Sequence, residues 1–289
     1  MMLNIHELSK KFGKKKALQP TSLSLNKGIV GLLGPNGAGK TTFLRILSTY
    51  YEADTGTIMF NELDWSKDLE KVRKHIGYLP QHIGGFPNLT AREYLEYLGV
   101  LRGLDTKQLA TDIPAILREV NLEERVDDRI KSFSGGMRQR LGIAQAILHS
   151  PDVLLVDEPT AGLDPEERIR FRNLIKRLGK ERLVILSTHI TEDVAMTCDQ
   201  VLLMKNGSIE QYASIQEVTH LAKGKVWALE IDSTTYEQVR QNTDILITLT
   251  SRMDDVVDLR FIASDSIHPQ ATPVNPTLEE GYMVWLNKK

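Results

Sequence analysis

The chain has 289 residues, 41% of them hydrophobic and 26% charged, so it can bury a sizeable core and form one large domain with a small one, or two domains. Its formal net charge of −2 gives no global electrostatic attraction to nucleic acid or to anionic lipid. Its single cysteine, Cys198, excludes an intrachain disulfide and a cysteine-based zinc site.

Hydrophobic runs in the chain are short. They fall far below the roughly 18 residues that a membrane-spanning helix needs. The first residues lack a basic segment followed by an apolar one, so we expect no secretory signal. If the chain serves a membrane, we expect it to do so through a partner.

The N-terminal part alternates between apolar and polar residues, as half-buried strands do. Its predicted elements are strands over residues 2–9, 17–25, 29–33, 58–60 and 76–79, a basic loop over residues 10–16 and a helix over residues 43–47.

A glycine-rich segment follows the third of these strands: Gly34, Pro35, Asn36, Gly37, Ala38, Gly39, Lys40, Thr41 and Thr42. It fits the pattern G-x-x-x-x-G-K-[ST], in which glycines let backbone N–H groups wrap phosphates. Lys40 would reach the β and γ oxygens, and the Thr41 hydroxyl would ligate Mg²⁺. The segment predicts a nucleotide site, because the helix that follows it adds partial positive charge where phosphate sits.

From residue 81 to residue 151 the pattern is mainly helical. Thr90 and Glu93 form a capping box that opens an amphipathic helix through Leu101. This part of the chain therefore predicts a helical insert.

Ser134, Gly135 and Gly136 precede a helical run over residues 141–148. A hydroxyl and bare N–H groups at a helix start make a second anion site. One molecule cannot easily use both phosphate sites unless two molecules face each other.

Two adjacent carboxylates, Asp157 and Glu158, follow the apolar run of residues 153–156, which predicts a strand buried on both faces. Ligands of open α/β sheets bind at this end of the strands. Asp157 would hold the Mg²⁺ sphere, mostly through water, and Glu158 would polarise an attacking water as general base.

The rest of the chain alternates strands and helices. Asp164 and Pro165 predict a helix start, and Asn206 with Gly207 predicts a two-residue hairpin turn. The expected elements are a helix ending near residue 179, a strand over 183–186, a hairpin over 201–209, strands over 226–231, 245–249 and 259–262, a helix over 236–241, an extended loop over 264–276 and a terminal helix over 278–286.

Together, over about residues 3–215, these motifs resemble the nucleotide-binding domain of ATP-binding cassette (ABC) transporters. The resemblance implies an α/β fold: a P-loop NTPase core with a mainly parallel sheet, an antiparallel β subdomain and a helical insert over about residues 83–150. We expect this domain over residues 1–215 and a small α/β accessory domain over residues 216–289.

By this resemblance residues 34–42 are the Walker A motif, 153–158 the Walker B motif, 133–137 the signature motif and 161–164 the D-loop. Gln81 resembles the Q-loop glutamine, His189 the switch histidine that contacts the γ-phosphate, and Phe12 the aromatic residue that stacks on adenine. The signature has Phe133 for leucine and Met137 for glutamine, and neither change removes the serine hydroxyl or the two glycines.

The resemblance assigns every site residue. Those implied to bind ATP are Phe12, Gly34, Pro35, Asn36, Gly37, Ala38, Gly39, Lys40, Thr41, Thr42, Ser134, Gly135, Gly136 and Asp164. Those implied in catalysis are Lys40, Gln81, Glu158 and His189. Those implied to hold Mg²⁺ are Thr41, Gln81 and Asp157.

The implied activity is ATP hydrolysis by two nucleotide-binding domains that bind two ATP head to tail, so that Ser134 and Gly136 of one complete the phosphate shell over Lys40 of the other. The dimer, of two identical or two different chains, would drive a separate integral membrane permease from its cytoplasmic face, and no nucleic acid partner is expected. Residues 274–282, Val-Asn-Pro-Thr-Leu-Glu-Glu-Gly-Tyr, resemble the ending of ATPase subunits of bacterial exporters, which favours export.

Two alternatives stay open. One is a soluble ABC-type ATPase acting on ribosomes or DNA, a class that usually carries two cassettes or a long coiled coil. The other is an importer ATPase, which pairs with a binding-protein-dependent permease.

Overall fold

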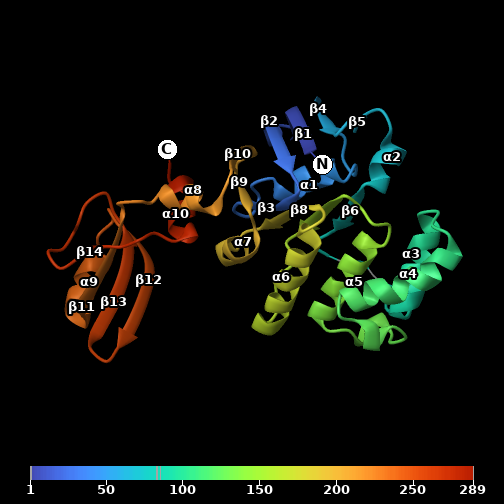
Figure 1. Cartoon of the computed structure of the whole chain (residues 1–289). Helices are drawn as coiled ribbons and strands as arrows, with labels where there is room; N and C mark the ends of the chain where they lie inside the picture. Colours follow the sequence, from blue (N-terminus) through green and yellow to red (C-terminus); the bar gives the residue numbers. More distant parts are fainter. Residues whose placement is uncertain (1, 83, 85, 289) are drawn as a thin grey trace. The chain divides into compact units, whose positions relative to one another are not determined.

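The computed structural model describes residues 2–82, 84 and 86–288 (Figure 1). The chain forms two compact units, one ending at Gln211 and one beginning at Tyr212, whereas the sequence suggested a boundary after residue 215. Ile83, the first residue of the expected helical insert, lies outside the described residues, as do Met1 and Lys289 at the ends of the expected domains.

A four-stranded antiparallel sheet in the order β2-β1-β4-β5 begins the first unit. Its strands are β1 (Met2–Phe12), β2 (Lys15–Asn26), β4 (Thr55–Phe60) and β5 (Leu63–Asp64). The basic loop expected over residues 10–16 is wrong, because Phe12 already pairs with Lys15 across a two-residue turn. Gly13, with φ of 58°, makes this tight turn possible, and exposed lysines are compatible with strand ends that face water.

The second sheet of this unit has six strands in the order β10-β9-β3-β8-β7-β6. They are β3 (Gly28–Leu33), β6 (Ile76–Leu79), β7 (Val153–Asp157), β8 (Leu183–Thr188), β9 (Gln200–Lys205) and β10 (Ser208–Tyr212). The pairs β6–β7, β7–β8, β8–β3 and β3–β9 are parallel, and every residue of β7 is buried, as the continuous apolar run predicted. Asn206 and Gly207 form the expected hairpin turn, with φ of 51° and 81°.

Helices cover the parallel sheet. Contacts join α1 (Lys40–Leu47) to β7, α2 (Leu69–Lys74) to β6, and both α6 (Pro165–Gly179) and α7 (Thr191–Thr197) to β3 and β8. Asp164 is the N-cap of α6, as predicted, and accepts a hydrogen bond from the Glu167 N–H at 2.8 Å. The elements therefore bring the carboxyl ends of β3, β7 and β8 to one edge.

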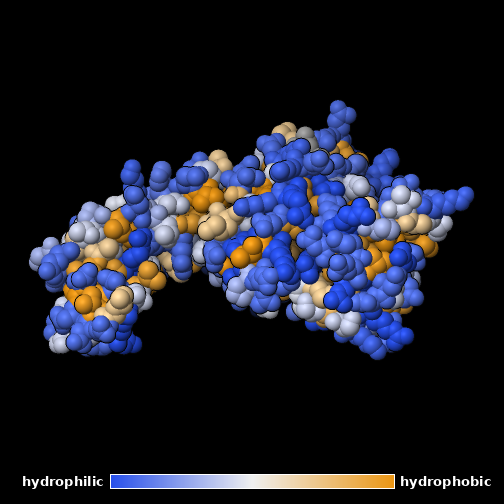
Figure 2. Space-filling view, turned by 60° about the horizontal axis from the view of Figure 1, so that its bottom comes forward, coloured by the Kyte–Doolittle hydropathy of each residue, from blue (hydrophilic) through white to orange (hydrophobic). Residues whose placement is uncertain are grey.

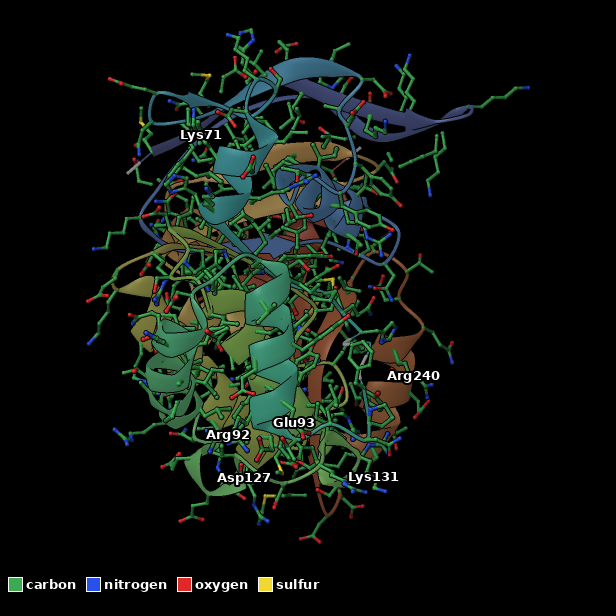
Figure 3. The ribbon with its side chains drawn as sticks, turned by 90° about the vertical axis from the view of Figure 1, so that its right-hand side faces the viewer. Lys71, Arg92, Glu93, Asp127, Lys131 and Arg240 are labelled. Atoms are coloured by element: carbon green, nitrogen blue, oxygen red, sulfur yellow. The ribbon has the colours of Figure 1, made fainter. Side chains whose placement is uncertain are left out.

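A helical insert lies between β6 and β7. It contains α3 (Ala91–Leu101), α4 (Thr106–Glu119), two short 3₁₀ turns, η1 (Glu123–Arg125) and η2 (Ile130–Ser132), and α5 (Gly135–Ile147). The capping box of Thr90 and Glu93 is confirmed. Figure 3 shows Arg92 and Glu93 at the start of α3 and Asp127 beside Arg92, whose Nε lies 3.0 Å from the Asp127 Oδ1.

Backbone hydrogen bonds join the two ends of this insert. Ile130 N donates to Leu89 O at 2.9 Å, and Lys131 N donates to Pro87 O at 3.0 Å. Pro87 and Leu89, the two acceptors, follow the segment that contains Gln81, and Ile130 and Lys131, the two donors, precede Ser134. Two backbone hydrogen bonds thus connect the segment that follows Gln81 with the segment that precedes Ser134.

The second unit is a small α/β domain. It contains α8 (Ile215–His220), β11 (Val226–Asp232), α9 (Ser233–Arg240), β12 (Leu246–Met253), β13 (Val256–Ile262), β14 (Thr272–Pro273) and α10 (Leu278–Leu286). Its sheet is antiparallel, in the order β12-β13-β11-β14, and α9 packs against β11 and β13 over a core that includes Tyr236, Leu259 and Phe261.

The terminal helix α10 is fastened inside this unit by Glu280. Glu280 is only 2% exposed, and it forms a capping box with Thr277 while its carboxylate lies 2.9 Å from Arg260 Nη2. α10 packs against α8 so closely that a Cβ at Gly281 would meet the Val218 carbonyl. Residues 274–282 therefore contribute hydrogen bonds, an ion pair and helix packing within residues 212–289.

Among the described residues, no helix is both long and apolar enough to cross a bilayer. The face seen in Figure 2 is mostly hydrophilic, with hydrophobic side chains in scattered patches.

Candidate active site

The glycine-rich segment joins β3 to α1 and wraps closely around the start of that helix. Gly37 and Gly39 have φ of 78° and 115°, which favour glycine. A Cβ at Gly34 would meet the carbonyl of Met204, so no larger residue fits there without a shift of the backbone. The segment thus presents backbone, rather than side chains, to a ligand.

Lys40 begins α1, and its side chain is buried under this segment. Its Nζ donates to Gly34 O at 2.8 Å and to Pro35 O at 3.3 Å, and it lies 3.0 Å from Glu158 Oε1. Both charged side chains are nearly inaccessible to water, so each neutralises a charge that would be costly to bury alone.

Glu158 follows β7 with its backbone in the left-handed region, at φ of 47°. Its N–H donates to the backbone carbonyl and to the hydroxyl of Ser187, each at 3.1 Å. Its Oε2 lies 2.7 Å from Nδ1 of His189, which is about half exposed at the end of β8. The carboxylate therefore bridges the P-loop lysine and the histidine.

Asp157 is buried beside it. Its Oδ1 accepts from Ser187 Oγ at 2.5 Å, while its Oδ2 is buried with no hydrogen-bond partner among the described residues. Burial, followed by the charge of Asp157, raises the pKa of the neighbouring Tyr78 and keeps that phenol neutral. An orphaned carboxylate oxygen at the carboxyl end of β7, a strand that contacts α1, suits Mg²⁺, which prefers oxygen ligands and few carboxylates.

Lys40, Glu158 and His189 open into one cleft of about 690 Å³, whereas the predicted residues Gly34, Pro35 and Asp157 are not part of its lining. Its lining includes the predicted residues Asn36, Gly37, Ala38, Gly39, Lys40, Thr41, Thr42, Gln81, Glu158 and His189. Five further lining residues were not predicted as site residues from the sequence: Lys15, Lys16, Ala17, Asn206 and Gly207. The short β1–β2 turn and the Asn-Gly hairpin bring them there, and the hairpin motif was the one signal available in the sequence.

Other predicted residues do not line this cleft. Phe12, at the end of β1, is 44% exposed and packs edge-on against Tyr51 at 5.3 Å between ring centres. Ser134 caps α5, where its Oγ accepts from Met137 N at 3.1 Å. Gly135, Gly136 and Asp164 lie with it at the starts of α5 and α6.

A second and larger groove, of about 1170 Å³, lies between the end of α1, β6 and the ends of α3 and α5. Its wall is rich in cations, with Arg73, Lys74 and Arg102. Burial, with help from the charge of Arg102, lowers the pKa of His149 to about 4, so this histidine is neutral at physiological pH. Exposed apolar side chains stand on α3 and just before it: Phe86, Tyr97, Val100 and Leu101.

The comparisons with known proteins agree with this geometry. The family model described as "ABC transporter" matches residues 18–161. The chain is 40% identical over 231 residues to YxlF of Bacillus subtilis, an uncharacterized ABC transporter ATP-binding protein, and this match covers 80% of the chain and 77% of the relative.

Two further relatives carry more specific names. The linearmycin resistance ATP-binding protein LnrL of Bacillus subtilis is 37% identical, with 72% of the chain and 68% of the relative covered. The Nod factor export ATP-binding protein I of Ralstonia nicotianae is 34% identical, with 76% and 69% covered. A solved structure of the ATP binding subunit of an ABC transporter superposes with a TM-score of 0.67 at 27% identity, and covers 76% of this chain and 92% of that one.

Proposed function

This chain belongs to the ABC transporter family of ATP-binding proteins, which hydrolyse ATP, and from that premise we propose that it works as one of two cassettes that close around two ATP molecules and drive a membrane exporter. One observation carries the proposal: two groups suited to phosphate are separate. Lys40, Glu158 and His189 line one cleft, whereas the residues from Ser134 to Gly136 lie outside it at the start of α5. A second cassette can supply the missing half.

The chemistry follows from the contacts of Lys40 and Glu158. When Lys40 takes a phosphate oxygen of ATP, that oxygen replaces the Glu158 carboxylate, now 3.0 Å away, as its partner. Glu158 is then free to accept a proton from water while the water oxygen bonds to the γ-phosphorus and the bond to the β-phosphate oxygen breaks. His189 orients the other carboxylate oxygen from 2.7 Å, and it can stabilise the charge that develops on the γ-phosphate.

The remaining assignments rest on position. Thr41, Asp157 and Gln81 would hold Mg²⁺, which when bound neutralises charge on the phosphate oxygens. Phe12 is assigned to adenine, because its exposed ring lies in the hairpin that sends Lys15 and Lys16 to the cleft.

The permease is assigned to the larger groove, whose cationic wall adjoins exposed apolar side chains on α3. Gln81 lies near the start of the insert, and the hydrogen bonds of Leu89 with Ile130 and of Pro87 with Lys131 give a mechanical link from there to Ser134. Docking of a permease would hold the chain against the cytoplasmic face of the membrane.

Export is favoured over import. The support is the printed name of the Nod factor export relative, the linearmycin resistance of another, and the exporter-like segment 274–282. An importer ATPase, or a cassette ATPase acting on ribosomes or DNA, would be a different outcome of the test below.

Two experiments test the proposal. Affinity purification of the full chain should recover an integral membrane protein; recovery of a substrate-binding protein together with it would indicate an importer, and recovery of ribosomes or nucleic acid instead would overturn the proposal. Light scattering of the Glu158→Gln variant should show a dimer that forms with ATP, while adding Lys40→Ala should abolish it. A Glu158→Gln chain that stays monomeric with saturating ATP would contradict the two-cassette site.

A further inference from the structure

The start of α5 and the start of α6 are in direct contact through one carboxylate. Gly136 packs against Glu167 in the first turn of α6, because a Cβ at Gly136 would meet the Glu167 carboxylate and force that side chain to shift. The two helices run side by side in Figure 1, and contacts between them confirm the packing. The Glu167 side chain therefore lies between the serine-glycine segment and α6.

Arg140 faces the same carboxylate from the second turn of α5. Its Nη2 lies 3.6 Å from Glu167 Oε1, and the two side chains are only 8% and 13% exposed. The Nε of Arg140 is buried and has no hydrogen-bond partner among the described residues. A buried guanidinium without full hydrogen bonding depends on its carboxylate, so the pair ties α5 to α6.

Glu167 also reaches Asp164, through its backbone. Its N–H donates to Asp164 Oδ1 at 2.8 Å, which fixes that side chain as the N-cap of α6. One residue thus contacts Gly136 with its side chain and Asp164 with its main chain.

We propose that Glu167 and Arg140 are a positioning pair that holds the residues from Ser134 to Gly136 in register with Asp164, so that both segments meet the ATP of the opposite cassette as one rigid face. The inference rests on the proposed two-cassette site. Its physical basis is preorganisation, because a face that is already ordered loses less conformational entropy when the cassettes close. The nucleotide cleft of the same chain, around Lys40, does not include either residue of the pair.

The chain supplies a matched control. Glu166 and Glu167 both pair with Arg170, at 2.5 Å and 2.9 Å, but of these two carboxylates only that of Glu167 also pairs with Arg140 among the described residues. Glu166→Gln and Glu167→Gln therefore remove the same charge and the same arginine contact from one helical turn. They differ in the link to α5 and in burial, since the Glu166 side chain is 75% exposed and that of Glu167 only 13%.

The test uses the full chain with Glu158→Gln and measures the ATP concentration at which half of it dimerises. Adding Glu167→Gln should raise that concentration about tenfold, the effect of weakening one coupled contact, whereas Glu166→Gln should leave it within about twofold. Binding of a fluorescent ATP analogue to the monomer should stay unchanged in both. Arg140→Met should act like Glu167→Gln, and Arg140→Lys should recover part of the loss.

The outcomes separate the two ideas. Equal dimerisation midpoints for the Glu166 and Glu167 variants would overturn the positioning pair and leave the two-cassette site intact. Weaker analogue binding by the Glu167→Gln monomer would also overturn it, because the effect would then lie in the chain's own cleft. Failure of Glu158→Gln alone to dimerise would overturn the proposed function and this inference with it.

Discussion

Replacing Glu280 by glutamine should destabilise the C-terminal unit far more than one lost charge on a surface would. Five donor contacts converge on this buried carboxylate. Oε1 accepts from Arg260 Nε at 3.0 Å and from the Thr248 hydroxyl at 3.1 Å. Oε2 accepts from Arg260 Nη2 at 2.9 Å and from the N–H and hydroxyl of Thr277 at 2.7 and 3.1 Å. A glutamine side chain keeps one oxygen and turns a donor NH₂ toward the remaining donors.

The magnitude follows from these contacts. Removing one partner of a fully buried pair costs about 3–5 kcal/mol, and a hydrogen bond to a charged group contributes about 1.5–3 kcal/mol. Arg260 is 27% exposed, so its guanidinium can recover some hydration. We therefore expect the free energy of unfolding of this unit to fall by about 2–4 kcal/mol.

The loss should depend on pH. Burial alone would raise the pKa of Glu280, but the hydrogen bonds from Arg260 and Thr277 outweigh it and hold the pKa below its usual value. The carboxylate thus contributes stability above its unfolded pKa of about 4.3, and that contribution is lost as pH falls through the lower folded pKa. The difference between wild type and Glu280→Gln should shrink in acid.

Urea unfolding followed by tryptophan fluorescence measures this effect. With Trp65→Phe, the remaining tryptophans, Trp227 and Trp285, both report on residues 212–289. Glu279→Gln, the exposed neighbour, is the control. If Glu280→Gln unfolds within about 0.5 kcal/mol of that control at neutral pH, the reasoning is refuted, since a surface change falls in that range.

Three further predictions concern the first unit. Glu158→Gln should slow ATP hydrolysis by about 10²–10⁴-fold, and it should bind ATP about tenfold more tightly because the carboxylate no longer competes for the buried lysine. Phosphate release measures the first effect and titration calorimetry the second. Hydrolysis at the wild-type rate would show that Glu158 is not the general base. Gly39→Ala should abolish ATP binding in the same titration, because its Cβ would meet the Ala17 carbonyl at a backbone φ of 115°; undiminished binding would contradict the packing. Thr160→Val removes the 2.6 Å hydrogen bond to the buried Asp193 carboxylate, so the free energy of unfolding measured by thermal denaturation should fall by about 1.5–3 kcal/mol, and Thr160→Ser should lower it less. Equal stabilities of wild type and Thr160→Val would show that the bond contributes little.

Much of the fold could be predicted because its signals are local. The Thr90–Glu93 capping box, the N-cap Asp164 and the Asn206–Gly207 turn each fix an element end from a few neighbouring residues. The segment around Phe12 was mispredicted for the converse reason. Lysines are rare in half-buried strands but compatible with exposed strand ends, and only the pairing partner shows that the strands continue there.

The candidate site divides in the same way. The P-loop is a continuous motif, whereas the meeting of Glu158 with His189 depends on β7 lying next to β8, which no local pattern states. The role we propose for Glu167 was invisible for a related reason. On the sequence, the acidic and basic residues that begin α6 look like solvent-exposed pairs within one helix, and the contact with α5 needs the packed structure.

The left-handed backbone of Glu158 is a strain that the contacts of the same residue compensate. A side chain in this region costs roughly 1–2 kcal/mol, which glycine would avoid. Two hydrogen bonds from its N–H to Ser187 hold the residue in place and aim its carboxylate at Lys40. Selection for thermal stability alone should therefore retain a carboxylate at position 158, because glycine or asparagine would leave the buried Lys40 without its ion partner at a cost of about 3–5 kcal/mol, more than the backbone strain that is relieved.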